Sequence, residues 1–388
     1  MGRREYLKAI YNRYHRSAAE QKGTILDEFC EVCSYNRKYA IRLLNGPPPG
    51  ARPRPRRTRG PSYGRTVIQT LAQVWEAAGY PWSVRLRAML PLWLPWLRQR
   101  LALTPELERQ LRAISPRQID RRLQSRKRVL RRRLYGRTKP GTLLKHHIPI
   151  KTDHWDVTQP GFTEIDLVSH SGECAEGEFA HSFNLTDIHT TWTETYAVLG
   201  KGETGILAGL EEMRRALPFA LCGIDSDNGS EFLNHHLVRY CRTGHIQFTR
   251  GRPYKKDDNA HIEQKNWTHV RKLIGWDRYD SPAALGLLND LYRSELRLMM
   301  NLFQPSVKLL RKERVGSRLR RAYDRPQTPL DRLRVCRGVD RAKVNALLRL
   351  RATTDPFELA RIIEKKLDRI AALARHRGAE GRVTKQMA

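Results

Sequence analysis

An α/β fold with helical flanks is predicted for this chain by the order of its elements and by the distribution of its charge. Between residues 150 and 280, short β-branched and aliphatic runs alternate with amphipathic helical patterns, which is typical of a sheet covered by helices. From Gly161 to Glu263 the chain has nine Lys and Arg against sixteen Asp and Glu, a local net charge of −7. The whole chain has a net charge of +32, so the remainder carries +39. We therefore expect an acidic central domain between flanks that bind a polyanion.

The first two of three separated acidic positions in this centre lie on predicted strands. Asp166 lies in the run Thr163–Val168, whose β-branched and aliphatic residues predict a buried strand. A second strand, Ala220–Asp227, ends at Asp227, directly before an Asn-Gly turn. Asp225 is two residues before Asp227, on the same face of the predicted strand, and is a rival candidate for the second metal ligand. An isolated Asp-Asn-Gly more often indicates an Asx turn than a catalytic site. The catalytic interpretation of Asp227 therefore depends on its combination with Asp166 and Glu263.

The third acid, Glu263, lies on a predicted helix, because Ile262, Val270 and Leu273 recur at near-helical spacing. Two more strands are predicted within residues 181–199 and one over 245–249, with helices over 203–217 and 233–241. The predicted order is three strands, helix, strand, helix, strand, helix.

This combination resembles the catalytic core of DDE recombinases, the retroviral-integrase-like transposases of bacterial insertion sequences. The resemblance rests on an Asp in a first strand, on Asp-Asn-Gly-Ser-Glu-Phe after a later strand and on a helical Glu, and it covers roughly residues 150–280. It implies an RNase H-like catalytic core, a mixed sheet with helices, with which the element order agrees. It also implies that Asp166 bridges two metal ions, that Asp227 binds one of them and that Glu263 binds the other.

The chemistry of such an enzyme asks for converging carboxylates. In-line attack on a phosphodiester is helped by two divalent ions about 3.5–4 Å apart, and hard ions such as magnesium prefer carboxylate oxygens. We therefore expect Asp166, Asp227 and Glu263 to be the catalytic and metal-binding residues, with two Mg²⁺ (or Mn²⁺) ions per active site.

The N-terminal flank is expected to hold a helical module and a linker. Residues 1–46 predict three short helices, and the third exposes three basic side chains opposite an apolar face. A helix-turn-helix that binds DNA and a plain helical cap explain this pattern equally well. Residues 47–64 form a Pro/Arg linker, with six Pro and five Arg between Pro47 and Pro61. Its arginines fit either a phosphate backbone or a solvated spacer.

Residues 65–134 are expected to form a second helical, DNA-binding module. Two short helices begin at Thr104-Pro105 and Ser115-Pro116, where a capping residue precedes Pro at the first helical position. The second continues into an Arg-dense run, which is typical of a helix-turn-helix. The DNA-binding candidates here are Arg117, Gln118, Arg121, Arg122, Arg128, Arg131 and Arg132.

A basic loop, residues 250–259, precedes the Glu263 helix. The resemblance implies a mobile loop that contacts DNA at this place, and a solvated loop is the alternative. The candidates for DNA contacts in this loop and on the following helix are Tyr254, Lys255, Lys256, Lys265 and Arg271.

Residues 281–388 are expected to form a small basic and helical C-terminal region. An apolar helix over 285–300 is followed by a very basic segment over 308–325 and by a last helix that begins at Asp355-Pro356. The apolar repeat of the last helix covers barely two heptads, so packing on its own chain is favoured over a coiled coil, and a dimer contact is the alternative.

The six cysteines show neither a disulfide nor a zinc pattern, so no structural zinc is predicted, in contrast to the N-terminal module of retroviral integrases. Unpaired thiols favour a reducing cytoplasm, where the protein would associate with the nucleoid. The most apolar stretch, Ala88–Leu97, contains Pro91 and Pro95 and is too short to span a bilayer. No membrane partner is expected.

These features together predict a DNA transposase, which cleaves at the ends of an insertion sequence and transfers the 3′-hydroxyl ends into target DNA. The expected partners are double-stranded DNA, as terminal repeats and as target, and further copies of the chain in a dimer or higher homo-oligomer. The alternatives are an RNase H-like nuclease without strand transfer and a catalytically inactive DNA-binding regulator. Two basic helical modules favour the transposase, because a nuclease needs no recognition of element ends.

Overall fold

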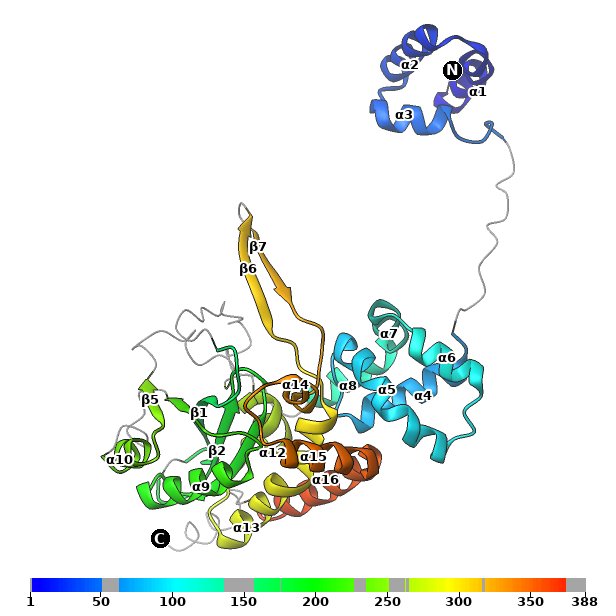
Figure 1. Ribbon diagram of the computed structural model, residues 1–388. Helices are drawn as coiled ribbons and strands as arrows, with labels where there is room; N and C mark the ends of the chain where they lie inside the picture. Colours follow the sequence, from blue (N-terminus) through cyan, green and yellow to red (C-terminus); the bar gives the residue numbers. More distant parts are fainter. Residues whose placement is uncertain are drawn as a thin grey trace, which may run out of the picture. The chain divides into compact units, whose positions relative to one another are not determined.

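The computed structural model describes residues 2–50, 63–135, 157–174, 176–226, 235–250, 262, 265–315 and 318–374 (Figure 1). The chain divides into two compact units, Met1–Ser62 and Tyr63–Ala388. Among the described helices, none combines the length and the apolar character that crossing a bilayer requires.

The first unit consists of α1 (Arg3–Arg16), α2 (Ala19–Cys33) and α3 (Arg37–Leu44), as the sequence predicts. The three helices enclose a small core of their own, with Phe29, Cys33 and Leu44 fully buried. The side chain of Asn36 accepts the backbone N–H of Lys38 at 3.0 Å and so begins α3.

The second unit is built on a five-stranded mixed sheet in the order β3-β2-β1-β4-β5. Its strands are β1 (Phe162–Ser169), β2 (Ala180–Asp187), β3 (Thr193–Leu199), β4 (Gly223–Ser226) and β5 (Gln247–Arg250). β1 pairs antiparallel with β2 and parallel with β4, β2 pairs antiparallel with β3, and β4 pairs parallel with β5. The predicted strands and their order in the chain are confirmed.

The two faces of this sheet differ in chemistry. Cross-strand partners share a face, and the register places Asp166 opposite Asn184 and Glu164 between Thr186 and Asp225. We call this the polar face. The residues between them, including Ile165, Phe183, Leu185 and Ile224, are fully buried and form the apolar face.

Helix α9 (Glu203–Ala216) covers the apolar face, and α10 (His235–Thr243) packs on α9 and β5. Gly209 of α9 lies so close to the sheet that a Cβ atom there would stand 2.9 Å from the ring of Tyr196. Only glycine permits this approach of helix to strand.

Five helical segments follow β5 in the described part of the chain between residues 266 and 303. They are η2 (Asn266–Arg271), α12 (Lys272–Ile274), α13 (Pro282–Leu291), η3 (Tyr292–Leu296) and η4 (Met299–Phe303). The π-helix η2 packs on β1, while α13 and η3 pack on β3. Asn289 bonds both the N–H and the C=O of Ala197, and Asn301 bonds both groups of Thr193. These two amides satisfy the backbone of β3 at the edge of the sheet, which would otherwise be open to pairing with another strand.

The helices of residues 65–134 are α4 (Arg65–Ala77), α5 (Ser83–Arg100), α6 (Pro105–Ala113), α7 (Pro116–Arg122) and α8 (Gln124–Tyr135). The predicted caps are confirmed: Thr104 Oγ1 accepts the N–H of Leu107 at 3.2 Å, and Ser115 Oγ accepts that of Gln118 at 3.3 Å.

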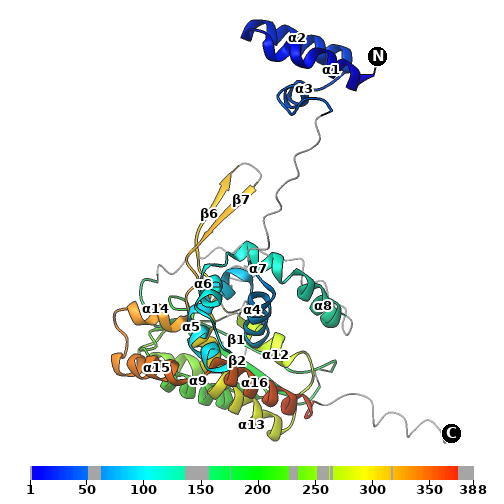
Figure 2. The same cartoon turned by 90° about the vertical axis from the view of Figure 1, so that its right-hand side faces the viewer.

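The expectation that residues 65–134, 150–280 and 281–388 form separate domains needs correction, because they share one hydrophobic core. α14 (Pro329–Val335), α15 (Arg341–Thr353) and α16 (Pro356–Ala371) complete the unit, and α16 packs against α4, α5, α13, η3 and η4 (Figure 2). Trp93 and Phe357 meet edge to face, with ring centroids 4.8 Å apart. The last helix therefore packs on its own chain.

Polar contacts fix the same docking. The turn after α4 exposes the carbonyls of Ala78 and Gly79, which accept from Gln304 Nε2 at 2.7 Å and Lys272 Nζ at 2.5 Å. A cation at a helix C-terminus is favoured by the helix dipole. These contacts join residues about two hundred positions apart, so local sequence patterns do not reveal them.

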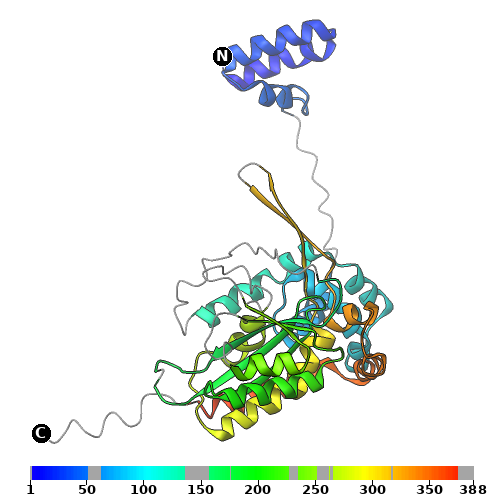
Figure 3. The same cartoon turned by 60° about the vertical axis from the view of Figure 1, so that its left-hand side comes forward.

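The basic segment 308–325 forms an antiparallel hairpin of β6 (Leu309–Val315) and β7 (Arg318–Tyr323). The hairpin extends away from the rest of the second unit in all three views (Figure 3). These two strands were not predicted from the sequence.

Candidate active site

Asp166 lies half-buried on β1, the central strand of the sheet, and points to the polar face. Its Oδ2 accepts Nδ2 of Asn266 at 2.5 Å, and its Oδ1 accepts the backbone N–H of Leu167 at 2.7 Å. The strand and η2 together hold the carboxylate in one orientation.

A hydrogen-bonded relay extends from Asp166 across the polar face. Asn266 Oδ1 accepts Nδ2 of Asn184 at 2.5 Å, and Asn184 Oδ1 accepts Oγ1 of Thr195 at 2.7 Å. The relay joins η2 to β1, β2 and β3. A network in which every member is satisfied fixes side-chain rotamers, and here it orients the predicted catalytic Asp166.

Asp227 and Glu263 lie outside the described residues, but their neighbours in the sequence are described. Ser226 is the register partner of Ile165, directly before Asp166 on β1. The backbone N–H of Ile262 donates to Oε2 of Glu164 at 2.8 Å, and Glu164 is only 2% exposed. Residues that precede the second and third predicted acids are thus held at β1, next to the first.

Asp225, the rival of Asp227, has a bond of its own: its Oδ1 accepts Oγ1 of Thr249 at 2.6 Å. It lies beside Glu164 in the register of β1 and β4. Within the described part of the chain, no group of three His, Cys, Asp or Glu side chains could hold a metal ion. Two of the three acids that the prediction needs are outside that part.

Lys265 needs a correction as a candidate for DNA contacts. It is 8% exposed, and its ammonium donates to the carbonyl of Thr191 at 3.2 Å. Burial, with smaller contributions from Arg85 and Arg332, lowers the pKa of Lys265 to about 7. The side chain points into the protein because its helix lies on the sheet, and this orientation cannot be read from helical spacing alone.

Arg271 is half-buried, and its guanidinium lies 4.0 Å above the ring of the exposed Trp276. It also donates to the carbonyl of Gly275 at 3.3 Å, and burial lowers its pKa. A stacked arginine of this kind retains part of its planar edge for a phosphate or a base.

The candidates on α7 and α8 differ in accessibility. Arg117, Arg121 and Arg128 are exposed. Gln118 and Arg122 are half-buried, and Gln118 Oε1 and Arg122 Nε are buried without a hydrogen-bond partner among the described residues. Because α7 has only seven residues, its exposed surface is short for a recognition helix. Outside the described side chains are Arg131, Arg132, Tyr254, Lys255 and Lys256.

A second relay on the polar face was not predicted. His170 Nε2 and Ser182 Oγ are 2.7 Å apart, and Ser182 Oγ is 2.6 Å from the hydroxyl of Tyr292. His170 is fully buried, and its Nδ1 has no hydrogen-bond partner among the described residues. Burial, and to a lesser extent Arg271 and His181, lowers the pKa of His170 from 6.5 to about 3. The imidazole is therefore neutral in the folded protein.

The neutral state of His170 predicts a pH dependence of stability. The unfolded chain takes up a proton near pH 6.5 that the folded chain does not, so stability falls as the pH decreases from about 6.5 towards 3. One such proton contributes a slope of up to about 1.4 kcal/mol per pH unit. His170→Gln keeps a polar partner for Ser182 and removes this proton.

We expect the free energy of unfolding of His170→Gln to depend less on pH between 6 and 4 than that of the wild type, measured by urea denaturation in a pH series. The exposed His235→Gln is the matched control. Equal slopes for wild type and His170→Gln would refute the neutral assignment.

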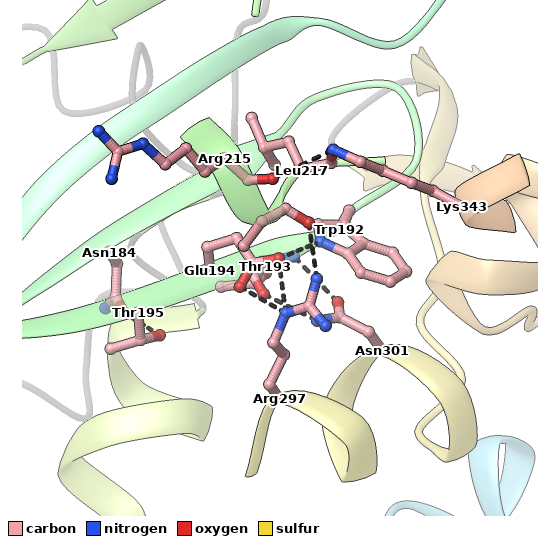
Figure 4. A network of polar contacts seen from close by, with 11 residues as sticks. Asn184, Trp192, Thr193, Glu194, Thr195, Arg215, Leu217, Arg297, Asn301 and Lys343 are labelled. Carbon is pink, nitrogen blue, oxygen red and sulfur yellow. Dashed lines mark hydrogen bonds and ion pairs between the residues drawn. The ribbon is translucent and has the colours of Figure 1, made fainter. Parts of the chain in front are cut away.

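A buried ion pair between Arg297 and Glu194 lies at the end of α9 (Figure 4). Arg297 Nε lies 2.8 Å from both oxygens of Glu194, and the other end of the guanidinium donates to the carbonyl of Ala216 at 2.8 Å. Trp192 Nε1 donates to the same carboxylate at 2.8 Å. Glu194 is 4% exposed, so every oxygen of this buried charge is satisfied within the protein.

This topology defines an α/β protein built on a five-stranded mixed sheet that is covered by helices. Similar solved structures include the catalytic core domain of BIV integrase (14% identity, 29% of this chain and 68% of that chain, TM-score 0.25). They also include the HTLV-2 integrase catalytic core domain in complex with magnesium (13% identity, 38% and 92%, TM-score 0.29). A third is the simian T-cell lymphotropic virus intasome in complex with PP2A regulatory subunit B56 gamma (14% identity, 53% and 67%, TM-score 0.31).

The chain is 38% identical over 336 residues to the uncharacterized protein y4rM of Sinorhizobium fredii (strain NBRC 101917 / NGR234), and the match covers 85% of this chain and 94% of that protein. The chain belongs to the family of y4rM. No protein-family model matches it.

Proposed function

We propose that this protein is a DNA transposase that cleaves at insertion-sequence ends and joins the 3′-hydroxyl ends to target DNA. The observation that carries the proposal is the arrangement around Asp166. A carboxylate on the central strand is oriented by a relay, and the residues next to Asp227 and Glu263 are held at the same strand. Asp166, Asp227 and Glu263 are the set of acids that the resemblance to DDE recombinases requires.

The donors fit magnesium or manganese. Asp166, Asp227 and Glu263 would supply hard carboxylate oxygens, and the carboxylate of Asp166 is oriented by the N–H groups of Asn266 and Leu167. Two bound ions would activate the attacking oxygen and stabilise the leaving oxygen of an in-line displacement. Asn266 would keep Asp166 in the orientation that such binding needs, in the way that outer hydrogen bonds orient metal ligands.

The strongly positive flanks support a DNA substrate. The chain carries +32 in total, while its central segment is acidic. Duplex phosphates would be bound outside the acidic centre, by exposed arginines such as Arg117, Arg121 and Arg128, and by the loop residues Tyr254, Lys255 and Lys256. Further copies of the chain would bring two DNA ends together.

The test is a strand-transfer assay with the full chain. Labelled duplexes from the DNA on either side of the coding region are incubated with a plasmid target and with magnesium or manganese. We expect labelled DNA joined to the plasmid with either ion and none in EDTA. Calcium should support binding but little joining, because its looser coordination does not fix the in-line geometry.

Two results would replace the proposal with an alternative. Shortened products without joined products would identify a nuclease that does not transfer strands. Specific binding of the duplexes without any cleavage, with either ion, would identify a DNA-binding regulator.

A further inference from the structure

The β6–β7 hairpin, residues 309–323, is here called the basic arm. It carries six cations and one acid, Glu313, in fifteen residues. The cations are Arg311, Lys312, Arg314, Arg318, Arg320 and Arg321. An isolated two-stranded ribbon has no core and is only marginally stable in water, and like charges on neighbouring strands destabilise it further. The arm therefore has a composition that a polyanionic partner would stabilise.

The root of the arm is firmly held by the second unit. The backbones of Ser306 and Gln327 exchange hydrogen bonds of 2.8 and 3.1 Å, and Lys308 Nζ donates to the carbonyl of His189 at 2.8 Å. Arg332 pairs with Asp324 and donates to the carbonyl of Ser306 at 2.8 Å. A rigid root sets the direction of the arm without contacts along its length.

The root shares a support with the candidate active site. Ser306 Oγ lies 2.7 Å from Oγ1 of Thr191, in the turn between β2 and β3. The carbonyl of the same Thr191 accepts the ammonium of Lys265, two residues after Glu263 in the sequence. The arm and the helix that follows Glu263 are thus fixed to one turn.

Beyond the root, described charged side chains of the arm lie on both faces of the ribbon and are exposed. Arg314 is two residues after Lys312 on β6, and Lys312 pairs with Arg321 on β7, so Arg314 and Arg321 lie on one face of the ribbon. Arg320 pairs with Glu313 and lies on the other face. All three arginines are exposed, and among the described residues no ion pair involves them. Glu313 is engaged by Arg311 at 3.2 Å.

We propose that the basic arm inserts into a groove of duplex DNA beside the active site. Cations on both faces match a groove, where phosphates lie on two sides, whereas a flat anionic surface would be met by one face only. The major groove of B-DNA is wide enough for a two-stranded ribbon. The inference rests on the proposed function in assigning the DNA to this active site, and it names the element that holds that DNA.

The experiment measures binding of the full chain to a fluorescein-labelled, random-sequence duplex by anisotropy, in EDTA, over a salt series of about 50 to 200 mM. The variant is R314Q/R320Q/R321Q. The control is R239Q/R349Q/R369Q, three exposed arginines outside the arm, which changes the net charge equally. Because no metal is present, the outcome does not depend on whether the protein cleaves or joins DNA.

We expect the arm variant to bind the duplex at least about tenfold more weakly than the wild type. The slope of log affinity against log salt concentration should be shallower by about 2 to 3, because each lost phosphate contact removes about 0.9 from that slope. The control should keep the wild-type slope. The proposal would be overturned if the two triple variants lost affinity for the duplex equally. It would also be overturned if the wild type bound one labelled strand of the duplex, tested alone, more tightly than the duplex.

A second measurement uses the unaltered chain and so does not depend on the folding of a variant. Amide hydrogen exchange of peptides covering residues 309–323 should slow when excess duplex is added, because bound DNA covers the ribbon. Unchanged exchange at saturating duplex would likewise overturn the proposal.

Discussion

Asp166→Asn is expected to lower strand cleavage and joining by roughly 10³-fold or more, at the upper end of the loss caused by removing one preorganised electrostatic group. The change removes a negative charge from the central strand and keeps the shape of the side chain. The hydrogen bond from Asn266 can persist with the amide oxygen. Binding of duplex DNA should remain nearly intact, because few phosphate contacts are lost. Joining of labelled ends and anisotropy on the same samples provide the two readouts.

Asp225→Asn is the matched control, since Asp225 is an Asp of the neighbouring strand that is already bonded to Thr249. It should retain cleavage and joining within about tenfold, the lower limit for residues that act only by supporting a site. A result in which Asp225→Asn lost activity while Asp166→Asn and Asp227→Asn kept it would show that the ligands were assigned incorrectly.

Arg297→Met is expected to have the largest effect on stability. It leaves the buried carboxylate of Glu194 without its cation, and breaking a buried pair from one side costs about 3–5 kcal/mol. The change also removes the donor to the carbonyl of Ala216. The free energy of unfolding from urea denaturation at neutral pH gives the measurement.

Arg215→Met is the control for this change. Arg215 pairs with Glu211 and Glu212 on α9, but its side chain is 67% exposed, so at most about 1 kcal/mol is expected. The double variant Glu194→Leu/Arg297→Met should recover part of the loss, because no unpaired charge is then buried. Similar losses for Arg297→Met and Arg215→Met would mean that the buried pair does not stabilise the fold.

Local pattern was sufficient to predict most elements of the sheet. The strands around Ile165, Phe183 and Ile224 have apolar residues at alternate positions, and α9 has an amphipathic repeat. Asp166 was a candidate because its combination with Asp227 and Glu263 resembles the acids of DDE recombinases. The caps at Thr104 and Ser115 were equally evident, since a capping residue followed by Pro is a local signal.

The partners of Asp166 were not predictable in the same way. Asn266 is one hundred residues from Asp166, and Asn184 and Thr195 lie on two further strands. Their relay depends on register and on the packing of η2, which are long-range properties. For the same reason, the position of Lys265 on the helix after the basic loop made it a candidate for DNA contacts, although the tertiary structure buries it against Thr191.

The sequence alone determined the α/β class of the centre, the acidic candidate Asp166 and the excess of positive charge on both flanks, because composition, periodicity and capping act over a few residues. Only the tertiary structure decided that residues 65–134 and the C-terminal helices share the core of the sheet, and that the segment 308–325 stands out as a hairpin. The physical reason is that burial is a property of packed surfaces: the same apolar stripe on α5 or α16 fits a separate module or a shared core, and only its contacts, such as Trp93 with Phe357, distinguish the two.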